Sequence, residues 1–227
     1  MNDAVEFHDS IAQSFGKRYG QSARFAERLD AWREAIDAHV SKESVVMDLG
    51  CGPGHLTALA AARAKRVIAV DGSAEMIREA TRVCQGVGDV EFRQAMLEDV
   101  RASALPPLDA ILCSSVMEYV KEPAAVLEQC REALKASGVF VVSVPNGNSW
   151  YRWLERISFR LLGRPGYLQY VREVASMRRE KERLETAGFR IREVRFYGAA
   201  PLLSPVFRMF GARRWSDTLI MMVAERR

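Results

Sequence analysis

The sequence predicts an α/β fold, in which helices cover both faces of a mostly parallel seven-stranded sheet. Three observations predict this fold. Short apolar runs alternate with helical patterns from Ser44 onward, glycines follow the first of these runs, and 227 residues are enough for one substantial core. Strands and helices that alternate in this way form right-handed βαβ units, and such units place their strands in parallel.

The first 40 residues have a helical pattern. Four apolar side chains recur at the spacing of one helix face: Phe25, Leu29, Trp32 and Ile36. We therefore expect residues 1–43 to form a helical cap ahead of the first strand.

Five strands are predicted between Ser44 and Val144. They cover residues 44–49, 66–70, 90–93, 108–113 and 139–144. Between them we expect helices over 55–64 and 123–135, and a third helix that begins after Ser73 as its N-cap. Strands over 189–196 and 218–224 complete the sheet. Because no helix long enough for a crossover directly precedes the last strand, we expect that strand to run antiparallel.

The clearest functional pattern is a glycine cluster after the first strand. Gly50, Gly52 and Gly54 would let bare backbone approach a ligand, and the next helix would direct free N–H groups toward it. A G-x-G pattern alone is weak evidence for a ligand-binding site, since tight turns between strand and helix use glycine in any case. Asp71, however, ends the second strand 21 residues after Gly50, where a carboxylate can accept both hydroxyls of a ribose.

Four segments resemble motifs of the class I S-adenosylmethionine (SAM)-dependent methyltransferases, in the same order and spacing over about residues 44 to 146. They are Asp48–Gly54 (DLGCGPG), Val70–Met76 (VDGSAEM), Leu108–Ser114 (LDAILCS) and Leu134–Val139 (LKASGV). The resemblance implies the Rossmann-like class I methyltransferase fold, with SAM as cofactor and S-adenosylhomocysteine (SAH) as product. A dinucleotide oxidoreductase would need a third glycine where this chain has His55.

The resemblance also implies which residues hold the cofactor. Residues 50–52 would pass under its amino-acid end, Asp71 would hold the ribose, and Met76 would flank the adenine. The acidic residue that the family offers to the adenine amino group is Met96 here, so the backbone of Leu97 would serve instead. The complete expected set is Arg24, Asp48, Gly50, Cys51, Gly52, Asp71, Gly72, Met76, Met96, Leu97 and Ser114.

Within this class the chain resembles the ubiquinone-biosynthesis O-methyltransferases. The stretches 113–120 (CSSVMEYV) and 145–150 (PNGNSW) are similar to theirs, and Arg24 matches an arginine of theirs that reaches SAM. Their histidine in the first stretch is Tyr119 here, so an imidazole base or metal ligand at that place is lost. We expect no metal.

The expected reaction is O-methylation of a phenolic or lipophilic small molecule. Methyl transfer is an in-line displacement, so the protein contributes mainly by aligning the nucleophile with the methyl group. The candidate bases are Tyr119, Glu118, His55 and His8. His55 has a second interpretation, as a polar residue at the start of a helix.

Other functions stay open at this point. They are N-methylation of a small amine, methylation of RNA or protein, and SAM binding by a non-catalytic regulatory module. Residues 150–183 carry nine basic and four acidic residues, which would suit docking to RNA. Nucleic acid is nevertheless not the expected partner, because neither the Asn/Asp-Pro-Pro-Tyr element nor the Pro-Cys pair of DNA methylases is present.

The segment after the fifth strand, residues 147–187, is the predicted lid insertion. An apolar stripe recurs at helical spacing, flanked by arginines: Trp150, Trp153, Leu154, Ile157 and Leu161. A basic amphipathic helix with tryptophans suits a membrane surface, whereas in a simple lid the stripe would pack on the core. Both interpretations stay open.

Four widely spaced cysteines predict buried free thiols in a reducing compartment: Cys51, Cys84, Cys113 and Cys130. No apolar stretch approaches the roughly 18 residues of a membrane span, and no secretory signal is recognisable. We expect one cytoplasmic domain over 1–227, with 44–146 as the SAM-binding core and 188–227 as C-terminal strands. Peripheral contact of 150–162 with the inner face of a membrane is an alternative, and the oligomeric state is left open.

Overall fold

The computed structural model describes residues 5–11, 23–200 and 204–227, apart from the side chains of residues 23–24 and 205–206. Its strands are β1 (Val45–Leu49), β2 (Arg66–Asp71), β3 (Val90–Gln94), β4 (Leu108–Ser114), β5 (Leu134–Pro145), β6 (Phe189–Ala199) and β7 (Asp217–Arg226). The α-helices are α2 (Ala23–His39), α3 (His55–Ala61), α4 (Ala74–Val83), α5 (Pro123–Ala133), α6 (Trp150–Leu162), α7 (Met177–Thr186), α8 (Ser204–Met209) and α9 (Arg213–Ser216). Short 3₁₀ helices are η1 (Leu97–Asp99), η2 (Ala102–Ala104), η3 (Met117–Tyr119) and η4 (Gly166–Gln169). Residues 5–11 are helical as well.

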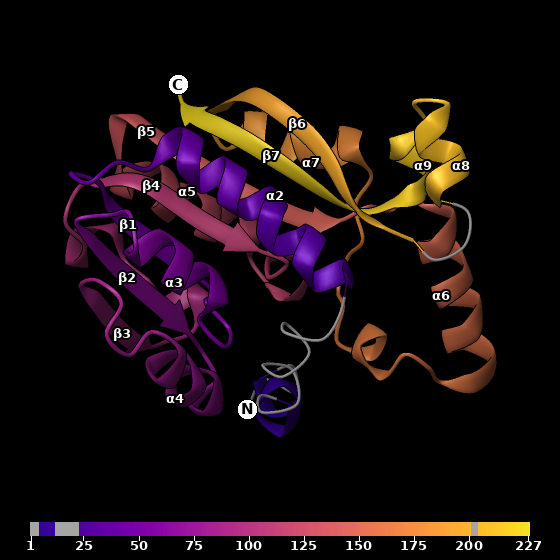
Figure 1. Ribbon diagram of the computed structural model, residues 1–227, viewed down its shortest axis with the longest axis horizontal. Coiled ribbons are helices and arrows are strands. Elements are labelled where there is room, and N and C mark those ends of the chain that lie inside the picture. Colours follow the sequence, from indigo (N-terminus) through magenta and orange to yellow (C-terminus); the bar gives the residue numbers. More distant parts are fainter. Residues whose placement is uncertain (1–4, 12–22, 201–203) are drawn as a thin grey trace.

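The strands form one sheet in the order β3-β2-β1-β4-β5-β7-β6 (Figure 1). Strands β1 to β5 pair in parallel, and β7 runs antiparallel to both β5 and β6. The predicted α/β fold with an antiparallel last strand is therefore confirmed. Strand order reverses between β1 and β4, and open α/β sheets bind their ligands at such a point.

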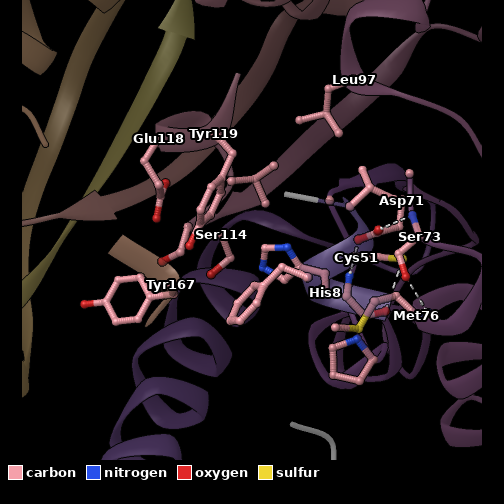
Figure 2. Close-up of a pocket in the computed structure, with 18 of the residues that line it drawn as sticks. His8, Cys51, Asp71, Ser73, Met76, Leu97, Ser114, Glu118, Tyr119 and Tyr167 are labelled. Carbon is pink, nitrogen blue, oxygen red and sulfur yellow. Dashed lines mark hydrogen bonds between the residues drawn. The ribbon is translucent and has the colours of Figure 1, made fainter. Parts of the chain in front are cut away.

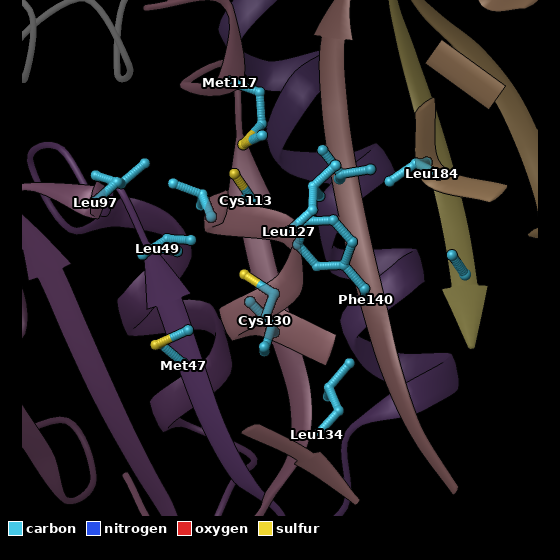
Figure 3. Packing of buried hydrophobic residues seen from close by; sticks show 14 of the residues in the cluster. Met47, Leu49, Leu97, Cys113, Met117, Leu127, Cys130, Leu134, Phe140 and Leu184 are labelled. Atoms are coloured by element: carbon cyan, nitrogen blue, oxygen red, sulfur yellow. The ribbon is translucent and has the colours of Figure 1, made fainter. Parts of the chain in front are cut away.

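Each face of the sheet carries its own apolar layer. Helices α2, α3 and α4 cover one face, where Trp32 and Ile36 are buried as the helical pattern predicted. Helices α5 and α7 cover the other face, where Leu127 and Phe140 are among the fully buried side chains (Figure 3). The Trp32 indole N–H also donates to the Tyr197 hydroxyl at 3.1 Å, which fixes α2 on the sheet. All four cysteines are buried and free, as predicted.

Some boundaries differ from the predictions. Helix α3 ends at Ala61 rather than at residue 64, and β5 begins at Leu134, where its pairing with β4 is irregular. The short helices α8 and α9 were not predicted, because one turn of helix leaves no periodic pattern. The Arg208 guanidinium fixes α8 through ion pairs with Glu27 and Asp217. In the described parts of the chain, no helix combines the length and the hydrophobicity that a membrane span requires.

Candidate active site

A cavity of about 490 Å³ lies at the carboxyl ends of β1, β2 and β4. Its other walls come from residues 5–11, α2, α6 and the 3₁₀ helices η1, η3 and η4. Figure 2 shows two groups of side chains with His8 between them. Asp71 and Met76 belong to one group, and Glu118, Tyr119 and Tyr167 to the other. We call these the glycine end and the tyrosine end of the cavity.

The glycine turn after β1 has positive φ angles at all three glycines, a conformation that side chains rarely adopt. A Cβ at Gly50 would lie 2.3 Å from a methyl carbon of Val116, and one at Gly54 would lie 2.7 Å from the Cα of Ala80. These two glycines therefore permit close packing of the turn. A Cβ at Gly52 would meet no atom within 4 Å, so this glycine faces the open cavity.

Asp71 is fixed at the end of β2 by two backbone donors. The N–H of Gly52 donates to its Oδ2 and the N–H of Ser73 to its Oδ1, both at 2.9 Å. Burial raises the pKa of the Asp71 carboxyl, while these hydrogen bonds and the nearby His8 act in the opposite direction. Ser73 is the N-cap of α4, as predicted, and accepts from the N–H of Met76 at 3.0 Å.

Residues 96–98 form one wall of the glycine end of the cavity. Met96 and Leu97 line the cavity, and the Met96 sulfur would lie 2.9 Å from a Cβ at Gly72. Sequence reasoning noted the missing acid at Met96 but overlooked Glu98, which also lines the cavity. The Glu98 carboxylate accepts the backbone N–H of Lys121 at 3.1 Å.

At the end of β4, an arginine reaches into the cavity from α2. The guanidinium of Arg28 donates to the Ser114 hydroxyl at 2.7 Å and to its carbonyl at 3.2 Å. Sequence reasoning named Arg24, whose side chain lies outside the described residues. It missed Arg28, although residues four apart share one face of a helix. Ser115, which follows Ser114 at the end of β4, has φ 56°, and its buried hydroxyl has no hydrogen-bond partner among the described residues.

The tyrosine end contains buried charges. The Glu118 carboxylate is buried, lines the cavity and leaves its Oε2 without a hydrogen-bond partner in the described structure. Burial raises the pKa of Glu118 to about 7, despite the opposing influence of Arg152 and Arg28. Burial, reinforced by the charge of Glu118, also raises the pKa of Tyr119 above its ordinary value, so this phenol stays protonated at neutral pH.

Helix α6 supplies the far wall of this end. The Arg152 guanidinium donates to the Tyr167 hydroxyl at 2.6 Å and forms an ion pair with Glu155 at 2.8 Å. The Tyr167 hydroxyl donates in turn to Glu155 at 3.1 Å. Sequence reasoning did not foresee this triad, because its members come together only when η4 folds back along α6.

Residues 5–11 lie across both ends. The His8 ring packs edge-on against Tyr119, with ring centroids 5.2 Å apart, and Phe7 stacks on Tyr170 at 4.9 Å. The Asp9 carboxylate accepts a short hydrogen bond from the Ser73 hydroxyl. This segment therefore joins the glycine end to the tyrosine end.

The cavity brings together most of the predicted site residues. The catalytic candidates that line it are His8, His55, Glu118 and Tyr119. The expected cofactor residues that line it are Gly50, Cys51, Gly52, Asp71, Gly72, Met76, Met96, Leu97 and Ser114. Asp48 does not line the cavity. Its carboxylate lies buried behind the glycine turn, where it accepts a hydrogen bond from the Thr57 hydroxyl at 2.6 Å. Within the described ranges, no group of three or more His, Cys, Asp or Glu side chains is placed to hold a metal ion.

Comparison with known proteins places this geometry in context. A model of the family described as "Methyltransferase domain" matches residues 40–192. The chain is 38% identical over 130 residues to trans-aconitate 2-methyltransferase of Azoarcus sp. These aligned residues cover 55% of this chain and 49% of that protein. It is 36% identical over 102 residues to ubiquinone biosynthesis O-methyltransferase of Xylella fastidiosa, 44% of this chain and 42% of that protein. The chain thus spans about half the length of these curated relatives.

Solved structures share the fold. Magnesium protoporphyrin IX methyltransferase from Synechocystis, with bound SAH, superposes with a TM-score of 0.72 over 98% of both chains at 17% identity. A putative methyltransferase of Haloferax volcanii, in complex with the Trm112 methyltransferase activator, gives 0.70 over 96% of this chain and 97% of that chain at 20% identity. The Rossmann-like class I methyltransferase fold implied by the sequence motifs is therefore confirmed.

Proposed function

The chain belongs to the family described as "Methyltransferase domain", and we propose that it is a SAM-dependent methyltransferase that acts on a small molecule and releases SAH. The observation that carries this proposal is a single cavity with Asp71 and the glycine turn at one end and Glu118 and Tyr119 at the other. Two ligands that react with each other need such a shared space. The names of the two curated relatives, which denote methyltransferases of small molecules, support the same class of acceptor.

The residues of the glycine end fit SAM, which when bound supplies a methyl group on a positively charged sulfur. Each Asp71 oxygen accepts one backbone N–H, which leaves lone pairs for the two hydroxyls of a ribose. Gly52 leaves the space above the turn open. Leu97 offers apolar contact to an adenine, and Arg28 offers a guanidinium to the amino-acid carboxylate.

The tyrosine end favours a phenolic acceptor, and O-methylation is the finer form of the proposal. Aromatic rings line this end, which suits a flat ring, and the volume of the cavity is typical of small-molecule sites. The open Oε2 of Glu118 can accept the proton of a hydroxyl group. A carboxyl with a pKa of about 7 is a stronger base than an ordinary glutamate and is still about half ionised at neutral pH. Tyr119, as a protonated phenol, would donate a hydrogen bond to the molecule that receives the methyl group.

Methyl-labelled SAM, incubated with the pure protein and a source-cell extract, tests this proposal. We expect label in an organic-soluble small molecule. Asp71→Ala should weaken SAM binding by about 1–3 kcal/mol through loss of the ribose hydrogen bonds. Glu118→Gln should keep SAM binding, measured by calorimetry, and lose methyl transfer.

Other outcomes would overturn specific parts of the proposal. Label in RNA or protein would replace the small-molecule acceptor with a macromolecule. Label in a small amine would replace O-methylation with N-methylation. SAM binding without transfer to any fraction would indicate a regulatory SAM-binding module, and unchanged SAM affinity in Asp71→Ala would refute the cofactor assignment.

A further inference from the structure

Helix α6 is amphipathic, but polar side chains lie on the face toward the protein and exposed apolar side chains lie on the opposite face. Its polar residues Arg152 and Glu155 face the cavity, each with a side chain only 15% exposed. Several of its apolar residues face outward: Trp153 is 60% exposed and Leu161 is 76% exposed, whereas Trp150 and Ile157 are partly buried. No residue of α6 is buried. The outer residues of the predicted apolar stripe, Trp153, Leu154 and Leu161, therefore do not pack on the core.

A second apolar segment lies beside α6, at the same end of the molecule (Figure 1). Helix α9 contacts both α6 and α8. Met209 and Phe210, at the end of α8, are each 75% exposed, and Trp215 of α9 is 46% exposed. Together, these three residues and the exposed residues of α6 account for all the large apolar side chains that the described structure leaves exposed. Chance exposure would have scattered them over the surface.

Arginines accompany this apolar surface. The exposed ones are Arg156, Arg160 and Arg164 in and after α6, and Arg213 and Arg214 in α9. None of the five has a described acidic side chain within ion-pair distance, whereas Arg178, Arg179 and Arg183 of α7 all pair with glutamates. The basic excess of residues 150–183 is therefore neutralised around α7 and available around α6.

We propose that this tryptophan–arginine surface, formed by the exposed residues of α6, α8 and α9, docks on a bilayer that contains anionic phospholipid. Tryptophan, leucine and phenylalanine side chains partition into the headgroup and acyl boundary, and arginines beside them attract anionic headgroups. The positive charge selects an anionic surface, and the exposed apolar side chains supply insertion. Because α6 forms the cavity wall on its opposite face, docking would bring the tyrosine end close to the lipid.

Vesicle flotation tests the proposal, and it needs neither SAM nor an acceptor, so its result is independent of the proposed function. The full chain is mixed with vesicles of equal parts phosphatidylcholine and phosphatidylglycerol, or of phosphatidylcholine alone. We expect binding to the anionic vesicles only, weakened by high salt. Leu161→Ser and Phe210→Ser, at positions that are 76% and 75% exposed, should each reduce the partition coefficient about tenfold.

A charge-matched pair of variants controls for net charge. Arg160→Gln with Arg213→Gln should reduce binding by about fivefold per residue. Arg82→Gln with Arg178→Gln removes the same charge from exposed positions elsewhere and should change binding by less than about twofold. Each of these two arginines is paired with a glutamate on its own helix.

Several results would overturn the proposal. The first is absence of binding to anionic vesicles, and the second is equal binding to phosphatidylcholine alone. An undiminished partition of Phe210→Ser would remove α8 from the surface. A concentration-dependent dimer that Leu161→Ser abolishes, without vesicle binding by the unaltered chain, would identify the surface as a contact between two copies of the chain.

Discussion

Removal of the buried charge at Asp48 should stabilise the protein in a pH-dependent way. Burial raises the pKa of this carboxyl from 3.8 to about 7, and only the Thr57 hydroxyl is bonded to it in the described structure. A carboxyl with a raised folded-state pKa holds its proton in the folded protein at pH values where the unfolded chain has lost it. The contribution of this carboxyl to stability is therefore highest below pH 3.8, falls as the pH rises through this window, and is flat above about 7.

The magnitude follows from the width of the window. Each pH unit between 3.8 and 7 costs about 1.4 kcal/mol, so between pH 5 and 8 this one group should destabilise the protein by about 3 kcal/mol. Asp48→Asn keeps the size of the side chain and cannot ionise. The difference in unfolding free energy between Asp48→Asn and the unaltered chain should therefore grow by about 3 kcal/mol from pH 5 to pH 8.

Urea unfolding, followed by circular dichroism at pH 5, 6, 7 and 8, measures this difference. Contributions from titrating groups that do not interact with Asp48 are common to both proteins and cancel in the subtraction. Asp30→Asn is the matched control, because its carboxylate is 65% exposed and forms an ion pair with Arg33 on its own helix. A difference for Asp48→Asn that stays constant within about 0.5 kcal/mol across this range would refute the argument that burial disfavours the charge.

Three further results are expected. Gly50→Ala should destabilise the chain by roughly 3 kcal/mol through its positive φ and the valine contact, whereas Gly52→Ala should cost about 1–2 kcal/mol and mainly weaken SAM binding; equal unfolding midpoints would contradict this. The methylation rate should rise with pH and pass through half its maximum near pH 7, where the Glu118 carboxyl is half ionised, and a profile that is flat from pH 5.5 to 8 would exclude this group as the base. A double-mutant cycle of Trp32→Phe and Tyr197→Phe should give a coupling of about 1 kcal/mol in urea unfolding, and zero coupling would mean that the hydrogen bond contributes nothing.

The sequence predicted what depends on local pattern. The period of Trp32 and Ile36 located a helix that the structure packs on the sheet, and the spacing of Gly50 and Asp71 located the glycine end of the cavity. These features repeat over a few residues or follow directly from the ends of adjacent parallel strands. The direction of the last strand was also predictable, because a parallel strand would have required a crossover helix.

Contacts between distant segments could not be predicted in this way. Arg28 meets Ser114 across 86 positions of the chain, and no local pattern relates the two. The outward orientation of α6 illustrates a different limit. A periodic apolar stripe shows that a helix has two faces, but it does not show which face contacts protein. Here the partly buried group of Arg152, Glu155 and Tyr167 determines the orientation.

The helical segment at residues 5–11 has a kinetic consequence. Its side chains contact the N-cap of α4 through Asp9, η3 through His8 and the C-cap of η4 through Phe7, so it lies against the glycine end and the tyrosine end at once. One displacement of this segment would uncover both ends of the cavity. If the two ends hold the ligands as proposed, exchange of SAH for fresh SAM and departure of the methylated product would share one opening rate. A substitution that slows this opening would then slow both release steps equally.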